Sequence, residues 1–327
     1  SIIASGRMDV RANDAMVHDY LAFGRIDHTD ETFFLGIKQL RGGHWLELEL
    51  ESGNFSIHQY YDIPIDHKRN RSSDQVYAEE FRQIFEDSVR SRLVSDVPVG
   101  ACLSGGLDSS SIVCMMSALV DGQQGQMTAE GLIKSFSARH DDPRHDEGQY
   151  IRSVVEKTGV DAHMVYPTVD GIERELDDLI WHQEQPFGST SIYAQWTVFD
   201  SARRAGVKVV LDGQGADESL GGYPTYNRDH LAYLLRSGKF PALYREAQQH
   251  HSIHGVSWLK MLAGMALYAS PEFLRKPLKA TIRRRQSNWL DQGFVREFGD
   301  LERYDWVPLK TNVFDHALYR SFHLVLP

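Results

Sequence analysis

The sequence predicts an α/β fold with a doubly wound parallel sheet, because apolar runs of strand length alternate with stretches of helical periodicity. A small β-hairpin precedes this alternating part, and a helical part rich in aromatic residues follows Tyr223. Repeated strand–helix alternation favours a parallel sheet that helices cover on both faces. We therefore expect two regions, residues 1–65 and residues 66–327.

The N-terminal region is predicted to hold one helix and one hairpin. Residues 13–23 favour a short helix that Asn13 caps. Residues 42–50 alternate apolar and polar side chains, as a half-buried strand does. A turn at residues 51–54 leads into a second strand at Phe55–Tyr61.

The polar, basic stretch 62–73 is predicted to be the linker between the two regions. Beyond it the hydrophobic pattern changes to longer periods. The expected elements are helix 76–93, strand 97–103, helix 109–120, strand 132–138, helix 147–158, strand 163–166, helices near 170–183 and 191–205, and strand 207–211.

The first chemical motif is the turn Ser-Gly-Gly-Leu-Asp-Ser-Ser, which joins strand 97–103 to the following helix. Its glycines leave room for an anion against bare backbone N–H groups, and the helix start adds a positive dipole end. Asp108 would repel a phosphate unless a cation bridges the two, so the motif predicts a di- or triphosphate held with Mg²⁺. The expected contacts are Ser104, Gly105, Gly106, Leu107, Asp108, Ser109 and Ser110.

The second motif, residues 212–223, follows the last predicted strand and reads Asp-Gly-Gln-Gly-Ala-Asp-Glu-Ser-Leu-Gly-Gly-Tyr. A loop so rich in glycine and acid is unlike a core segment. Because both motifs follow strands of one parallel sheet, we expect them to meet at its ligand-binding edge. Asp108 and Asp217 are the expected Mg²⁺ ligands, with their carboxylates roughly 4–6 Å apart or joined by water.

The first motif resembles the S-G-G-x-D-S pyrophosphate loop of the N-type ATP pyrophosphatases, and the second resembles a signature of asparagine synthetases. Together they resemble the synthetase domain of glutamine-dependent asparagine synthetases, from about residue 13 to the end. The resemblance implies an adenine nucleotide alpha hydrolase-like fold that uses ATP and Mg²⁺. It also implies activation of aspartate as β-aspartyl-AMP with release of pyrophosphate, followed by attack of ammonia.

The same resemblance assigns further contacts. Near the adenine it places the backbone of Cys102, Leu103 and Ala138, and near the nucleotide and the amino-acid substrate it places Asp212 and Gly213. Gln214 stands where many relatives have Glu with a suggested catalytic role, and an amide cannot act as a general base. Two alternatives therefore stay open: a relative that uses an internal amine, as β-lactam synthetases and macrolactam cyclases do, and a nucleotide-binding module without catalysis.

The resemblance also implies that residues 1–65 are the tail of a glutaminase domain that would supply ammonia from glutamine. The family continues with an R-x-P-F-L-D segment and a catalytic lysine, and neither occurs in this sequence. We therefore expect a fragment at both ends that has no glutaminase activity of its own. A homodimer is compatible with the resemblance, although the sequence itself fixes no oligomeric state.

The composition excludes several classes of protein. The net charge of −10 argues against a nucleic-acid partner, and no apolar run approaches the roughly 18 residues of a membrane span. The only cysteines, Cys102 and Cys114, fall in elements predicted to be buried, so we expect reduced thiols and a cytoplasmic protein.

Other features favour structural roles. Asp146 and Glu147 precede a helix, where capping is a better interpretation than catalysis. The trio His250, His251 and His254 looks metal-like but has polar flanks, and the basic run 275–285 is expected to be a solvated face. The expected aromatic core residues, or at best pocket walls, are Trp181, Tyr193 and Trp196.

Overall fold

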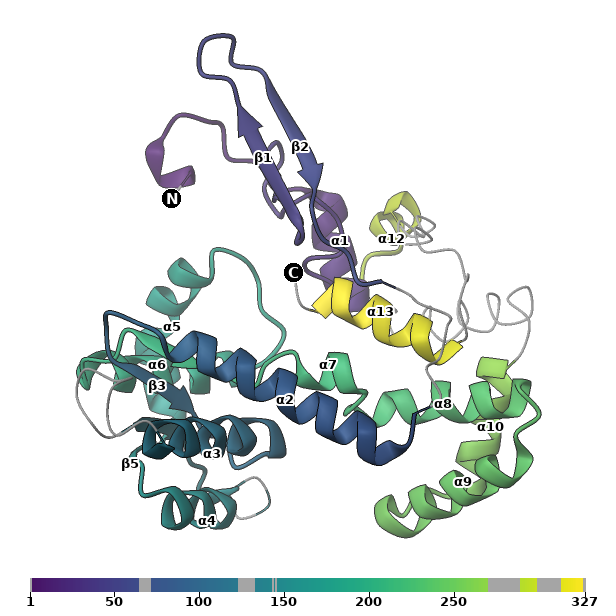
Figure 1. The fold of residues 1–327 in the computed structure, drawn as a ribbon. Helices are drawn as coiled ribbons and strands as arrows, with labels where there is room; N and C mark the ends of the chain where they lie inside the picture. Colours follow the sequence, from purple (N-terminus) through teal and green to yellow (C-terminus); the bar gives the residue numbers. More distant parts are fainter. Residues whose placement is uncertain are drawn as a thin grey trace. The chain divides into compact units, whose positions relative to one another are not determined.

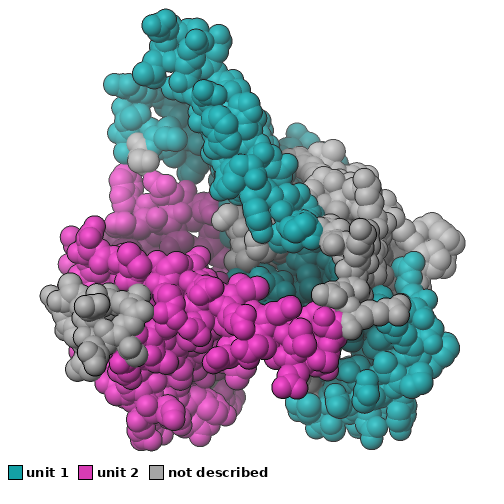
Figure 2. Space-filling model, in the orientation of Figure 1, with its two compact units in different colours: residues 1–68, 215–327 teal, residues 69–214 magenta. Residues whose placement is uncertain are grey.

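The computed structural model describes residues 2–64, 72–122, 133–142, 144, 146–269, 289–298 and 313–325. The chain divides into two compact units, which Figure 2 shows in different colours. Unit 2 is residues 69–214, and unit 1 combines residues 1–68 with residues 215–327. The division predicted from the sequence, with a glutaminase-domain tail up to residue 65 and a synthetase domain after it, stays a prediction.

Unit 2 is built on a four-stranded sheet in the order β5-β4-β3-β6, in which each neighbouring pair is parallel. The strands are β3 (Val99–Cys102), β4 (Lys134–Ala138), β5 (Asp161–Val165) and β6 (Val209–Leu211). The helices are α2 (Asp74–Leu93), α3 (Leu107–Gly122), α4 (Gly148–Thr158), α5 (Val169–Gln183) and α6 (Ser191–Arg204). Figure 1 shows these elements along the chain. The predicted strand–helix alternation is confirmed.

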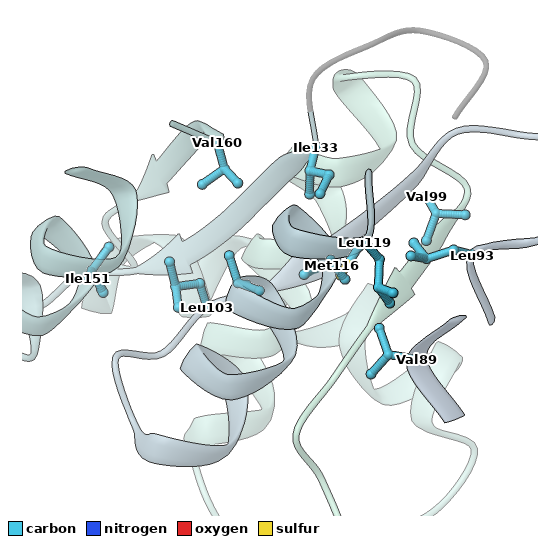
Figure 3. Close-up of a cluster of buried hydrophobic side chains, with 11 residues drawn as sticks. Val89, Leu93, Val99, Leu103, Met116, Leu119, Ile133, Ile151 and Val160 are labelled. Carbon is cyan, nitrogen blue, oxygen red and sulfur yellow. The ribbon is translucent and has the colours of Figure 1, made fainter. Parts of the chain in front are cut away.

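Two hydrophobic cores, one on each face of the sheet, hold unit 2 together. Figure 3 shows the larger core, in which Leu93 of α2, Met116 of α3 and Ile151 of α4 are fully buried. The smaller core joins Phe136 of β4 to Val198 of α6. Burying one such side chain contributes about 1.5–3 kcal/mol. Helices therefore cover both faces, as the predicted doubly wound sheet requires.

Successive strand residues alternate between the two cores, because side chains along a strand point to opposite faces. Ala101 and Leu103 belong to the larger core, whereas Cys102 between them packs against the smaller one. The backbone N–H of Leu103 donates to the carbonyl of Phe136 at 2.9 Å, so the pairing of β3 with β4 continues to the residue before the glycine-rich turn.

Unit 1 is largely helical. Its N-terminal segment, residues 2–64, contains a 3₁₀ turn (Ile3–Ser5), α1 (Asp14–Phe23) and an antiparallel hairpin of β1 (His44–Leu48) and β2 (Phe55–Gln59). The other helices are α7 (Ala216–Leu220), α8 (Pro224–Arg236), α9 (Phe240–His254), α10 (Trp258–Ala269), α12 (Gln292–Phe298) and α13 (Val313–Val325). Leu231 of α8, Ala247 of α9 and Met261 of α10 share a core.

Two predictions about the N-terminal segment are wrong in detail. Asn13 does precede α1, but its side chain makes no capping hydrogen bond and instead donates to the Glu31 carboxylate at 3.4 Å. The hairpin has no buried face, since every residue of β2 is exposed and β1 is exposed beyond His44. Alternation predicts a strand correctly, but it does not show whether anything covers the apolar side.

Two predictions about burial in unit 2 are also wrong. Cys114 lies on the exposed side of α3, while Cys102 is half-buried. Trp181 is 66% exposed, so it is not a core residue. Tyr193 is buried and lines a cavity of about 410 Å³ beside β5, and the half-buried Trp196 donates its indole N–H to Glu175 at 2.8 Å. The predicted linker lies mostly, and the basic run 275–285 wholly, outside the described residues.

Candidate functional site

The candidate site lies where the strand order of the sheet reverses. After β3 the chain adds β4 and then β5 on one side, and it later adds β6 on the other side of β3. In open α/β sheets ligands bind outside the carboxyl ends of the strands at such a switch point. The first motif leaves β3 and the second leaves β6. Both predicted loops therefore start at the switch point.

The serines of the first loop fix its backbone. The Ser109 hydroxyl accepts from the backbone N–H of Ser104 at 3.2 Å and is bonded to the Ser104 hydroxyl at 3.0 Å. The Ser104 hydroxyl in turn accepts from the Gly106 N–H at 3.2 Å. Gly105 has φ +93°, a left-handed conformation that favours glycine. Two of the three hydroxyls expected at the phosphates thus also hold the turn in shape.

Helix α3 begins within the motif, at Leu107. The first N–H groups of a helix have no partner inside it, so they face the space beyond the turn with the positive dipole end. Asp108 lies in this first turn, and in the part of the chain that the structure describes its carboxylate has no hydrogen-bond or ion-pair partner. The turn therefore offers donors for an anion beside one carboxylate that is free to take a cation.

The second loop closes against the start of α3. A Cβ atom at Gly213 would lie 3.1 Å from both the Asp108 Cβ and the Ser109 backbone nitrogen. A side chain at this position would force its neighbours to shift by a few tenths of an ångström, so glycine suits this close approach. The structure thus brings the second motif, through Gly213, to the carboxylate-bearing turn of the first. Gln214 follows at the end of unit 2 and is exposed.

The strand ends next to the first loop form the expected adenine side. The Ser137 hydroxyl donates to the carbonyl of Leu103 at 2.6 Å, which fixes the last buried residue before the turn. Burial, with a smaller effect from the Asp212 carboxylate, raises the pKa of the Cys102 thiol to about 12. Cys102 therefore stays a neutral thiol near neutral pH and cannot supply a thiolate nucleophile.

The remainder of the second motif belongs to unit 1 and is organised around its acidic residues. The Asp217 backbone carbonyl accepts from the N–H groups of Gly221 and Gly222 at 2.9 and 3.0 Å. A Cβ at Gly222 would overlap the Asp217 carboxylate, which explains the glycine there. The phenol of Tyr223 donates to the buried Glu218 at 2.8 Å, and burial raises the Tyr223 pKa to about 12. The distance from Asp217 to Asp108 stays a prediction.

Two contacts at the site were missed at the sequence level. The Gln195 amide donates to the Asp212 carboxylate at 3.5 Å, which links α6 to the second loop. Asp146, expected to be a helix cap, instead accepts two hydrogen bonds from Arg139, and the Gly148 N–H at the start of α4 makes only a small contribution to its lowered pKa. Glu147 is the N-cap residue of α4, but its side chain makes no capping hydrogen bond. No sequence periodicity signals these pairs, since both depend on loop geometry.

Within the described residues no group of three His, Cys, Asp or Glu side chains has metal-binding geometry. The His250 ring contacts the Asn227 amide at 3.2 Å, and His251 bonds the carbonyl of Val256 at 2.8 Å. Both rings thus have structural partners. A magnesium ion that arrives with nucleotide phosphates needs only one or two protein carboxylates, so Asp108 fits that role.

The fold and the two loops define a class, namely α/β proteins with two glycine-rich loops at the switch point of a parallel sheet. A family model described as asparagine synthase matches residues 80–327. The chain therefore belongs to the asparagine synthase family.

Curated relatives carry two kinds of name. Amidase chry2 of Gibberella zeae is 27% identical over 296 residues, which cover 88% of this chain and 42% of that protein. Putative glutamine-hydrolysing asparagine synthetase 2 of Methanocaldococcus jannaschii is 31% identical over 229 residues, with coverages of 70% and 42%. Glutamine-hydrolysing asparagine synthetase 3 of Bacillus subtilis is 28% identical over 269 residues, with coverages of 80% and 42%. The chain spans less than half the length of these relatives.

One solved structure, an NH3-dependent NAD synthetase from Campylobacter jejuni, aligns over 72% of this chain and 95% of its own. Its TM-score is 0.29 at 13% identity, so the fold class rests on the strand order and not on this likeness.

Among the described residues, no helix is both long and apolar enough to cross a membrane.

Proposed function

We propose that this chain is the ATP-using part of an amide-forming ligase of the asparagine synthetase type. The observation that carries the proposal is the approach of Gly213 to Asp108 and Ser109, which joins the two glycine-rich loops at the switch point. Membership of the asparagine synthase family supports the same assignment.

ATP would bind with its phosphates on the loop Ser104–Ser110 and its adenine beside the strand ends at Leu103 and Ala138. The open start of α3 supplies backbone donors for the phosphates. Mg²⁺, with Asp108 and Asp217 as its protein ligands, would neutralise phosphate charge. Asp212 and Gly213 would contact the nucleotide and the amino-acid substrate.

In the proposed reaction a substrate carboxylate, most simply the β-carboxylate of aspartate, attacks the α-phosphorus of ATP. The bond between the α- and β-phosphates breaks, and pyrophosphate leaves with the bonding electron pair. The N–H groups at the start of α3 would stabilise this growing negative charge, because hydrogen bonds within the loop fix the turn before the reaction begins. Ammonia then attacks the acyl-adenylate, and AMP leaves.

In the whole protein we propose that ammonia comes from glutamine, hydrolysed by a glutaminase domain of which residues 1–65 form the tail. The half-buried Cys102, whose pKa is raised, and Cys114 on α3 are unsuited to that hydrolysis. This chain alone should therefore use ammonium and release no glutamate from glutamine. A cytoplasmic location and a homodimer belong to the same proposal.

A second candidate is a ligase in which an internal amine of the substrate replaces ammonia. Gln214 favours it, because an amide cannot accept a proton as the Glu of many relatives could. The amidase name of the Gibberella zeae relative fits an amide chemistry on a substrate other than aspartate. A nucleotide-binding module without catalysis is the third candidate.

ATP–pyrophosphate exchange tests the three candidates. Aspartate-dependent exchange that Asp108→Ala abolishes is the expected result. Exchange that needs a different carboxylate would replace aspartate as the substrate, and ATP binding without any exchange would favour the bare module. Gln214→Glu sharpens the test, since a gain in ammonia-dependent asparagine formation would identify this position as the missing proton acceptor.

A further inference from the structure

A partly buried ion pair closes the loop between β4 and α4. The guanidinium of Arg139 donates to both carboxylate oxygens of Asp146, at 2.6 and 2.7 Å. The side chains are only 17% and 21% exposed. The Arg139 backbone N–H also donates to Val165 of β5 at 2.8 Å, which fixes the start of the loop to the sheet. We call this pair the clamp.

The clamp rests directly on the start of α4. A Cβ at Gly148 would overlap the Arg139 guanidinium, so the planar group occupies the space that a side chain would need. Hydrogen bonds from the guanidinium lower the Asp146 pKa to about 2, and the backbone N–H of Gly148 contributes a smaller lowering. Arg139 thereby ties the end of β4 to the first residue of α4.

The start of α4 in turn supports the loop of residues 104–110, which we call the phosphate loop. A Cβ at Gly105 would lie 3.1 Å from the Glu147 Cβ and carbonyl oxygen and 3.3 Å from the Ile151 side chain. Ile151 is fully buried in the larger core, so this surface cannot easily yield. Gly105 therefore adopts its left-handed turn against a packed surface that begins at Glu147, the residue after Asp146 of the clamp.

The two members of the clamp stand next to opposite ends of the proposed nucleotide site. Arg139 follows Ala138 on the adenine side, and Asp146 precedes Glu147, which contacts the phosphate loop. We propose that the Arg139–Asp146 clamp positions the phosphate loop relative to the adenine side and thereby sets the affinity for ATP. The proposal rests on the proposed function. Arg139 and Asp146 act as positioning residues, since they work through Glu147 and Gly105.

The same loop offers a matched control. Arg144 also pairs with Asp142, with its shortest contact at 2.6 Å, but its side chain is 82% exposed and is not among the atoms nearest to a Cβ at Gly148 or Gly105. An exposed ion pair of this kind contributes little to a fold. If loop closure alone mattered, the two pairs would behave alike.

The test measures ATP affinity by calorimetry in the presence of Mg²⁺. Asp146→Asn, which keeps the shape of the side chain but removes its charge, should weaken binding by about tenfold or more. Arg139→Lys keeps the charge but loses the fork of donors, so its loss should be smaller. Arg144→Gln should bind ATP as the wild type does. At saturating ATP the rate of ATP–pyrophosphate exchange of each variant should approach that of the wild type.

Hydrogen exchange of residues 102–110 without nucleotide gives a second readout. It should be faster in Asp146→Asn and Arg139→Lys, and unchanged in Arg144→Gln. If the wild type and the clamp variants have equal ATP affinity and equal hydrogen exchange of residues 102–110, the proposal is overturned. Should Asp146→Asn fail to fold, Arg139→Lys carries the same test. A wild-type chain that does not bind ATP contradicts the proposed function, whereas binding that clamp variants leave unchanged contradicts only the positioning role.

Discussion

The switch-point region, meaning β3, β4, β6 and the loops after them, contrasts with the N-terminal segment 2–64. Both contain apolar strands and glycine turns. In the switch-point region, Phe136 is 1% exposed, and Gly105 meets Glu147 and Ile151. In the N-terminal segment, Phe55 is 65% exposed, and no described atom lies within 4 Å of the place that a Cβ at Gly53 would take. Similar sequence patterns therefore contribute differently to stability, because neighbouring elements pack closely against Phe136 and Gly105 and, among the described residues, far less against Phe55 and Gly53.

Replacing an aromatic residue in each region should give the largest difference in the free energy of unfolding. Phe136→Ala should lower the free energy of unfolding by about 3–5 kcal/mol, because it leaves a cavity between β4 and α6. Phe55→Ala in β2 should change it by about 0.5 kcal/mol or less, as surface substitutions do. Urea unfolding followed by circular dichroism measures both. Equal losses would show that the hairpin is packed as tightly as the sheet.

The two glycines give a second test, since both have positive φ and differ in crowding. Gly105→Ala combines backbone strain with overpacking against Glu147 and should cost about 2–4 kcal/mol. Gly53→Ala adds only the strain and should cost about 1 kcal/mol. The Gly105 variant alone should also lose affinity for ATP. A Gly105→Ala protein with the stability and ATP affinity of the wild type would contradict the crowded turn.

The third comparison concerns two carboxylates, one in each region, whose effect on folding stability depends on pH and should be the smallest of the three. The pKa of Asp146 is lowered from 3.8 to about 2, chiefly by its hydrogen bonds to Arg139. A carboxylate whose pKa is lower in the folded state stabilises the fold above its unfolded pKa. This stabilisation should be complete above about pH 5 and lost as the pH falls through 3.8 to about 2. Asp146→Asn should therefore flatten the acid limb of the stability curve.

Asp30 of the N-terminal segment is the matched carboxylate. Its hydrogen bond to Lys38 also lowers its pKa, so the sign of the pH dependence is the same. The Lys38 and Asp30 side chains are 60% and 49% exposed, however, and solvent screens the pair. Asp30→Asn should shift the acid midpoint less than Asp146→Asn does. A larger shift from Asp30 would reverse the assigned importance of the two pairs.

Much of the fold could be predicted because its signals are local. The apolar runs and the helical periodicity placed each end of β3, α3 and β6 within two residues of its observed position. Glycine-rich turns marked both loops. The meeting of the loops at one edge followed from the parallel order of the strands. The approach of Gly213 to Asp108 agrees with that expectation inside unit 2.

What could not be predicted depends on contacts between distant or irregular segments. Cys114 lies on the uncovered side of an apolar helix, and the hairpin has the alternation of a half-buried strand without a described partner for its apolar side. The Arg139–Asp146 pair spans an irregular loop, where no periodicity relates the two residues. Asn13 takes the capping position but bonds Glu31, a choice that only the tertiary structure determines.

The loop after β3 and the loop after β6 are proposed to hold Mg²⁺ and ATP together, and titration of Asp108→Ala with ATP is the sharpest check of that pairing. The wild type should bind ATP more tightly with Mg²⁺ than without it. Asp108→Ala should fold normally but lose that dependence, with Mg²⁺-dependent affinity falling by about a hundredfold as one ligand of the ion disappears. An Asp108→Ala protein that binds ATP with the full Mg²⁺ dependence of the wild type would show that Asp108 is not a ligand of the ion.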